Sequence, residues 1–144
     1  MRFGIGKRQH VEAGRKRTKI AGFALVALGM CVPGAAIAGV GADAGAEVFS
    51  RCKACHALER NRTGPKLCHV VGREVGVIEG FHYSDALRQF GGVWTVERLS
   101  AFLESPTVTI RGTRMGYGGV KDADERAHLI RFLQVSAQDP SLCP

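Results

Sequence analysis

Short apolar stretches with helical spacing alternate with glycine-rich stretches along this chain, and no segment alternates like a β-strand over several residues. The first predicted helix, Ala44 to Arg51, has Asp43 as its cap and turns Val48 and Phe49 toward a core. Ser84 caps a second, shorter helix. Both helices are expected to depend on packing for their stability.

A clearer helix follows Thr95, which is its predicted cap. Val96, Leu99 and Leu103 recur at helical spacing and form its apolar stripe, with Phe102 on an adjacent one. The spacing therefore predicts a helix that packs on one face and ends at the proline that follows, Pro106.

The last predicted helix begins at Asp122, with Glu125 three residues later as a capping box. Its apolar face consists of Leu129, Ile130, Phe132 and Leu133. The chain is thus predicted to be all-α, with four short helices joined by loops. Because helices of about ten residues are marginal alone in water, such a domain needs a large apolar group in its core.

The N-terminal segment, residues 1–38, has the pattern of a secretory signal peptide. Met1 to Lys19 holds seven basic residues and one acid, and the uncharged stretch that follows reaches Ala36-Ile37-Ala38. We predict cleavage after this triplet and a periplasmic domain of residues 39–144. The stretch from Ile20 to Val40 is also about long enough to span a bilayer, so an uncleaved anchor is the alternative.

The leader changes the meaning of the net charge. The chain has 20 Lys and Arg against 13 acids, but the remainder after residue 38 keeps 13 basic residues against 12 acidic ones, a formal charge of +1. No basic run remains in that part, and the sequence therefore gives no reason to expect nucleic-acid binding.

The segment Cys52-Lys53-Ala54-Cys55-His56 is the most specific chemical motif in the chain, because Cys-x-x-Cys-His is typical of c-type haem attachment. Two thiols on one helical turn can form thioethers with the two vinyl groups of a haem, and the histidine follows as proximal iron ligand. A zinc site would need a second ligand pair, for which only Cys68-His69 is available. A redox dithiol would favour a βαβ pattern, which is not seen. We predict one covalent haem c.

Met115 is the candidate for the second axial iron ligand. Met1 and Met30 lie in the leader, so Met115 is the sole methionine of the predicted mature domain. Its loop, Ile110 to Tyr117, contains glycines that would let the thioether reach the open haem face. The less favoured alternatives are His69, His82 and His128.

Several further motifs occur in order along the chain. They are Gly45 with Phe49, Thr63-Gly64-Pro65-Lys66-Leu67, Gly72-Arg73, Phe81-His82-Tyr83-Ser84-Asp85-Ala86, Trp94, Ser105-Pro106 and Gly112-Thr113-Arg114-Met115. With the haem motif, this series strongly resembles the class I cytochrome c family, close to the mitochondrial type and its bacterial relatives. The resemblance covers roughly Ala44 to Gln134.

The resemblance implies a fold of short helices and loops wrapped around one covalently bound haem. It implies that Pro65 accepts a hydrogen bond from the His56 ring, and that Gly45 lets the first helix cross the last near Phe132. The residues it implies on the propionate side are Arg73, Tyr83, Trp94 and Thr113. The candidates for an apolar haem lining are Phe81, Tyr83, Trp94, Leu99, Phe102 and Tyr117.

The chain also departs from the family pattern. Arg111 stands where a proline usually precedes the methionine loop, Phe102 replaces a core tyrosine, and Leu87 replaces a polar residue near the buried haem edge. The family fold would bring Cys68 near the end of the last helix, which makes a Cys68–Cys143 disulfide plausible in an oxidising compartment.

The expected function is one-electron transfer by Fe(III)/Fe(II) cycling between a respiratory or periplasmic donor and an acceptor such as an oxidase, and not enzymatic catalysis. A haem subunit of a dehydrogenase complex is one alternative. An open-site haem sensor or enzyme is another; Met115 argues against it, while Arg111 keeps it open because the methionine loop lacks its usual proline.

Overall fold

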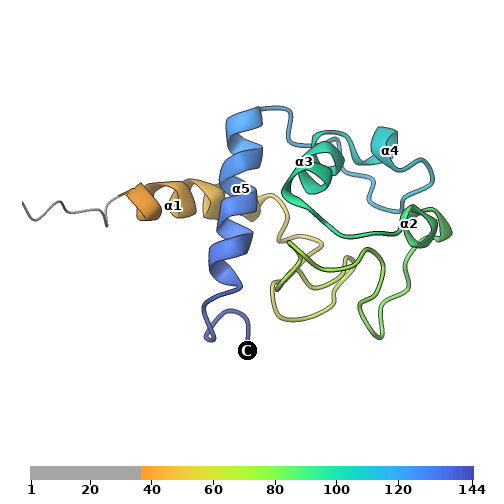
Figure 1. Ribbon diagram of the computed structural model, residues 1–144, viewed down its shortest axis with the longest axis horizontal. Coiled ribbons are helices and arrows are strands. Elements are labelled where there is room, and N and C mark those ends of the chain that lie inside the picture. Colours follow the sequence, from red (N-terminus) through yellow and green to blue (C-terminus); the bar gives the residue numbers. More distant parts are fainter. Residues whose placement is uncertain (1–36) are drawn as a thin grey trace, which may run out of the picture. The chain divides into compact units, whose positions relative to one another are not determined.

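The computed structural model describes residues 37–144, so the predicted leader lies outside the described residues except for its last two positions. Figure 1 shows helices of unequal length joined by long loops. The helices are α1 (Ile37–Ser50), α2 (Asp85–Phe90), α3 (Val96–Glu104), α4 (Pro106–Thr109) and α5 (Ala123–Ser136). Within 37–144 the pairing of extended segments is limited to one isolated antiparallel bridge, Glu74 with Val93. The all-α prediction is confirmed.

The two longest helices, α1 and α5, pack across each other at Gly45 (Figure 1). A Cβ at Gly45 would lie 2.2 Å from the His128 carbonyl oxygen and 2.6 Å from the Cβ of Phe132. The rings of Phe49 and Phe132 lie beside this crossing, with centroids 5.2 Å apart. The close approach predicted at Gly45 is confirmed, and only a residue without a side chain permits it.

Three of the predicted helix caps are present. The side chains of Ser84, Thr95 and Asp122 accept hydrogen bonds from the backbone N–H groups of Leu87, Arg98 and Glu125, at 3.2, 3.2 and 2.8 Å. Each bond satisfies an amide of the first turn that has no partner within the helix. Short polar side chains in the sequence therefore set where α2, α3 and α5 begin.

Two helix boundaries differ from the prediction. α1 begins at Ile37, so Asp43 is an exposed residue inside the helix and not its cap. The small and apolar residues before Asp43 continue the helix, and the exposed carboxylate remains in water. Pro106 ends α3, as predicted, but it also starts α4, because a proline fits the first turn of a helix, where an N–H has no partner.

The apolar stripe of α3 also differs from the prediction. Leu99 and Leu103 are buried, and so is Phe102, but Val96 is 42% exposed. Cα–Cβ bonds tilt toward the N-terminus of a helix, so a side chain in the first turn projects past the start of the helix. Val96 therefore lies beyond the edge of the core.

The long segment before α2 is held by hydrogen bonds to the segment before α3. Gly72 donates to the Trp94 carbonyl at 2.9 Å, and Trp94 donates to the Arg73 carbonyl at 2.9 Å. This exchange places Arg73 and Trp94 side by side. A disulfide joins Cys68 to Cys143, as the family resemblance implied. Over the described residues, no helix combines the length and apolarity that crossing a membrane requires.

Candidate functional site

The Cys-x-x-Cys-His motif directly follows α1 and continues it as a turn. The N–H of Cys52 donates to the Phe49 carbonyl at 2.8 Å, and the N–H groups of Cys55 and His56 donate to the Cys52 carbonyl at 3.1 and 2.9 Å. Both thiols are free, with Cys52 half-buried and Cys55 exposed. Two free thiols on one turn are what thioether formation with a haem requires.

Burial raises the pKa of the Cys52 thiol, an effect that the charge of Arg51 partly offsets. The thiolate is the form that attacks disulfides and binds metals, so the raised pKa lowers the fraction of Cys52 that is present as thiolate. The turn therefore presents Cys52 mainly as a protonated thiol.

The His56 ring is held in one orientation. Its Nδ1 lies 2.8 Å from the Pro65 carbonyl oxygen, and because a carbonyl can only accept, Nδ1 must carry the proton. Burial lowers the pKa of His56, although the bond to Pro65 acts in the opposite direction. The ring is therefore favoured in its neutral form, which leaves the Nε2 lone pair available to a metal. The hydrogen bond that the family resemblance implied is present.

Gly64 packs closely against the His56 ring. A Cβ at this position would lie 2.3 Å from Cε1 of His56 and 2.6 Å from both ring nitrogens. Gly64 is buried and donates its N–H to the Cys55 carbonyl at 2.8 Å. In the sequence this residue appeared only as a member of the Thr63-Gly64-Pro65-Lys66-Leu67 motif, since contact with a ring eight positions away leaves no local signal.

We expect Gly64→Ala to displace the His56 ring from Pro65 and to lower the free energy of unfolding by about 1–3 kcal/mol, the usual cost of overpacking. Denaturant unfolding would measure the loss, and the NMR signal of the His56 Nδ1 proton would report the displaced ring. Gly118→Ala is the matched control, because a Cβ there meets no atom within 4 Å. Equal stability of the two variants would contradict this expectation.

Trp94 and Tyr83 occupy the buried region near Arg73. Trp94 packs against Phe102, with ring centroids 5.0 Å apart, and Tyr83 meets Phe81 edge-on at 4.7 Å. Burial raises the pKa of Tyr83, while the nearby positive charge of Arg73 lowers it. The structure thus brings together three of the residues predicted on the propionate side.

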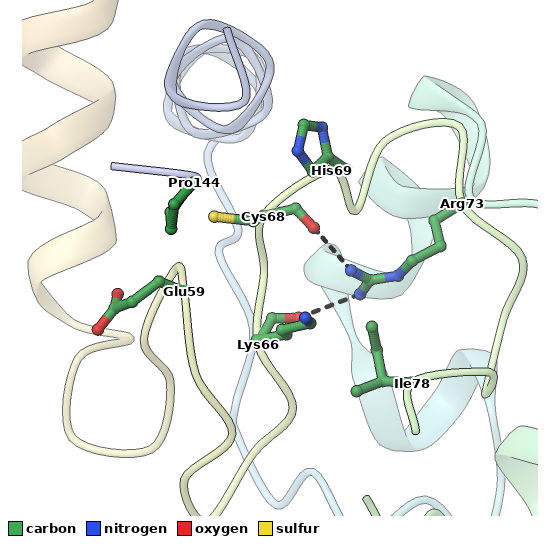
Figure 2. Close-up of a pocket in the computed structure, with 7 residues that line it drawn as sticks. All are labelled: Glu59, Lys66, Cys68, His69, Arg73, Ile78 and Pro144. Atoms are coloured by element: carbon green, nitrogen blue, oxygen red, sulfur yellow. Dashed lines mark hydrogen bonds between the residues drawn. The ribbon is translucent and has the colours of Figure 1, made fainter. Parts of the chain in front are cut away.

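The Arg73 guanidinium is turned toward the backbone of the preceding loop. It donates to the Cys68 carbonyl at 2.7 Å and to the Lys66 carbonyl at 3.1 Å, as Figure 2 shows. Arg73 thereby borders an open cavity of about 250 Å³, whose lining residues are Glu59, Lys66, Cys68, His69, Arg73, Ile78 and Pro144. Because a guanidinium has five N–H donors, these two bonds leave others for an anionic group.

The loop after α4 positions Met115. This side chain is half-buried and packs against the core, and its N–H donates to the Thr113 hydroxyl at 3.3 Å. Arg114 donates to the His82 carbonyl at 3.4 Å, which ties the loop to the segment before α2. The three alternative histidines, His69, His82 and His128, are exposed. Burial therefore favours Met115 over these histidines as a second axial ligand.

The residues that depart from the family pattern lie in two kinds of environment. Phe102 and Leu87 are buried, so an apolar core replaces polar groups at these positions. Arg111 is exposed at the start of the methionine loop. Tyr117, predicted beside an exposed haem edge, is half-buried and packs against the core.

Together, the donor set fits a c-type haem. Within residues 37–144 the two thiols of the motif are free while the other two cysteines are paired, and the histidine is neutral and oriented. Cys52 packs against a core of aromatic and aliphatic side chains, whose members and neighbours include Leu67, Phe81, Trp94 and Phe102. The arrangement can hold a covalently bound apolar macrocycle with an iron ligand already in place.

Comparison with known proteins supports the same assignment, although no family model matches the chain. The chain is 44% identical over 94 residues to the cytochrome c-type cyt cy of Rhodobacter capsulatus, which covers 64% of this chain and 47% of that protein. It is 41% identical over 101 residues to cytochrome c type-1 of Ascaris suum, covering 68% of this chain and 90% of that protein. Cytochrome cH from Methylobacterium extorquens matches in structure with a TM-score of 0.64 and 37% identity, over 65% of this chain and 97% of that one.

Proposed function

Because this chain belongs to the class I cytochrome c family, whose members are electron-transfer proteins with covalently bound haem c, we propose that it is an exported mono-haem carrier of single electrons. The donor is a respiratory or periplasmic protein and the acceptor a protein such as an oxidase. The observation that carries the proposal is the free thiol pair beside a neutral histidine whose ring is fixed by Pro65 and Gly64. When bound, haem c supplies reversible Fe(III)/Fe(II) exchange.

The chain's own residues perform three tasks in this proposal. Cys52 and Cys55 hold the haem covalently, and His56 presents Nε2 to the iron while Pro65 accepts the proton of Nδ1. Met115 would supply the second iron ligand, because it is the half-buried candidate on a loop that Arg114 ties to the His82 carbonyl. With two protein ligands, the iron has no open position for a gas or a substrate, which supports a carrier over a sensor.

The propionate side is assigned to Arg73, Tyr83, Trp94 and Thr113. Arg73 is half-buried, and burial lowers its pKa, but a guanidinium stays charged at physiological pH. Its charge would offset the negative charge of the propionates. Thr113 lies in the methionine loop itself, where its hydroxyl accepts a hydrogen bond from the Met115 backbone N–H.

The proposed export rests on the leader, and the proposed mode of partner recognition rests on the charge of the remaining chain. Residues 1–38 are proposed to be a signal peptide, cleaved in the periplasm, with an uncleaved anchor as the alternative. The formal charge of +1 left after residue 38 gives weak long-range steering toward a charged partner. Recognition of the redox partners would then depend on short-range contacts.

We expect Met115→Ala to remove completely the weak long-wavelength absorption band that marks methionine sulfur on ferric haem in this family. The variant should also bind carbon monoxide in its reduced form, because it has lost one axial ligand. Absorption spectra of the purified, haem-loaded protein in both oxidation states would test this. His82→Ala is the control, since this exposed histidine should leave the band unchanged. If the native protein lacks the band and binds carbon monoxide readily, the carrier proposal fails.

A further inference from the structure

The disulfide between Cys68 and Cys143 lies close in sequence to the loop that orients His56. We propose that this disulfide is a positioning element for the proximal histidine. It fixes the loop of residues 57–68, which contains Pro65, to the end of α5. The inference rests on the proposed role of His56 as an iron ligand. It assigns to the cysteine pair a task beyond general stabilisation of the fold.

The loop that follows His56 is shaped mostly by its own backbone. Leu67 and Cys68 both donate their N–H groups to the Leu58 carbonyl, at 3.0 and 2.8 Å, and Gly64 donates to Cys55 at 2.8 Å. These bonds define the shape of the loop and bring the Pro65 carbonyl oxygen to Nδ1 of His56. They do not attach the loop to the helices of the domain.

Besides the packing of Leu67 and Cys68 against the core, a side-chain hydrogen-bond donor and a covalent bond hold the end of the loop. One is Arg73, which donates to the Cys68 and Lys66 carbonyls but is also the proposed partner of the haem propionates. The other is the disulfide at Cys68, which does not depend on any side chain assigned to the haem. The disulfide is therefore the permanent attachment of this loop.

The other end of the disulfide is built onto α5. Cys143 donates its N–H to the Asp139 carbonyl at 2.8 Å, and Asp139 donates to the carbonyl of Ser136, the last residue of α5, at 3.2 Å. The Asp139 carboxylate accepts bonds from the N–H and the hydroxyl of Ser141, at 2.8 and 2.6 Å. Cys68 and Cys143 are both buried, so the tail forms a fixed turn between α5 and the loop.

Through these attachments, His56 and Pro65 are each connected to one of two helices that pack together. α5 packs against α1 at Gly45, where neither backbone has room to move closer. α1 leads through the main chain to His56, and α5 leads through Cys143 and Cys68 to Pro65. The donor His56 is thus attached to α1 and the acceptor Pro65 to α5, and these two helices pack against each other.

The test compares the mature, haem-loaded protein with its Cys68→Ala/Cys143→Ala variant. Leu103→Ala is the control, a buried truncation on α3 that lowers stability without touching the loop. The readouts are the solvent exchange rate of the His56 Nδ1 proton in the reduced protein and the reduction potential. We expect the double variant to exchange this proton at least about tenfold faster than the control. Its potential should rise, because a weaker Nδ1 hydrogen bond makes the ring a poorer donor to Fe(III).

Equal exchange rates in the double variant and the control, or an unchanged potential, would overturn the inference and leave the disulfide as a general stabiliser. Failure of the proposed function appears elsewhere, in the native protein itself. A native spectrum without a histidine-ligated c-type haem would reject the function before any variant is compared.

Discussion

Replacing both Cys52 and Cys55 with serine is expected to abolish covalent haem binding and to reduce the helical circular dichroism signal of the mature domain by about two-fifths, the share of helical residues in α2, α3 and α4. α2, α3 and α4 have only 6, 9 and 4 residues, and helices of this length do not form alone in water. The chain from residue 51 to residue 84 contains no helix and relies on loop hydrogen bonds. Without the macrocycle, these parts lose the apolar surface on which they pack.

The experiment uses protein exported with its own leader. Haem-dependent peroxidase staining after denaturing electrophoresis detects the covalent bond, and far-ultraviolet circular dichroism measures the helix content. The matched control is Cys68→Ser/Cys143→Ser, which replaces the same number of cysteines but should keep the covalent haem and most of the helix signal. Covalent haem in the Cys52/Cys55 variant would refute the proposed attachment site.

Gly45→Ala is expected to lower the free energy of unfolding by about 3 kcal/mol, a large share of the 5–15 kcal/mol that usually separates folded from unfolded domains. The new methyl would lie 2.2 Å from the His128 carbonyl oxygen and 2.6 Å from the Phe132 Cβ, well inside van der Waals contact. Two of the three nearest atoms belong to the backbone of α5, so no side-chain rotation relieves the clash. The helices must separate at the crossing that supports the haem motif.

Helix propensity acts in the opposite direction and makes this prediction a sharp one. Alanine stabilises a helix by about 1 kcal/mol relative to glycine, so a purely local effect would make Gly45→Ala more stable than the native protein. Denaturant unfolding of the haem-loaded protein decides between the two signs. Gly118→Ala again serves as the neutral control. A stability equal to or above that of the native protein would show that the helices tolerate the methyl.

Local sequence signals predicted the features that depend on local chemistry. The caps at Ser84, Thr95 and Asp122 were predictable because a short polar side chain bonds an amide two or three residues away. The haem motif was predictable because its chemistry requires its spacing. The Cys68–Cys143 pairing came only from the family resemblance, since spacing alone cannot give a connectivity.

Features that depend on distant contacts could not be predicted. The extension of α1 back to Ile37 placed Asp43 inside a helix, because an exposed carboxylate there has no cost large enough to end it. Val96 fitted the apolar period of α3 but is 42% exposed. The contact of Gly64 with the His56 ring required knowledge of how the loop folds back. None of these three features can be read from the neighbouring residues in the sequence.

The pairing of the cysteines has a consequence for how the protein is made. The described domain needs one pair oxidised, 75 positions apart, and another pair left as thiols although they stand three positions apart. Loop closure favours the near pair, so indiscriminate oxidation would join Cys52 to Cys55 first. Once both are consumed as thioethers, only Cys68 and Cys143 remain, and a single bridge is left to form. In biosynthesis, haem attachment before oxidation would therefore also determine which disulfide forms.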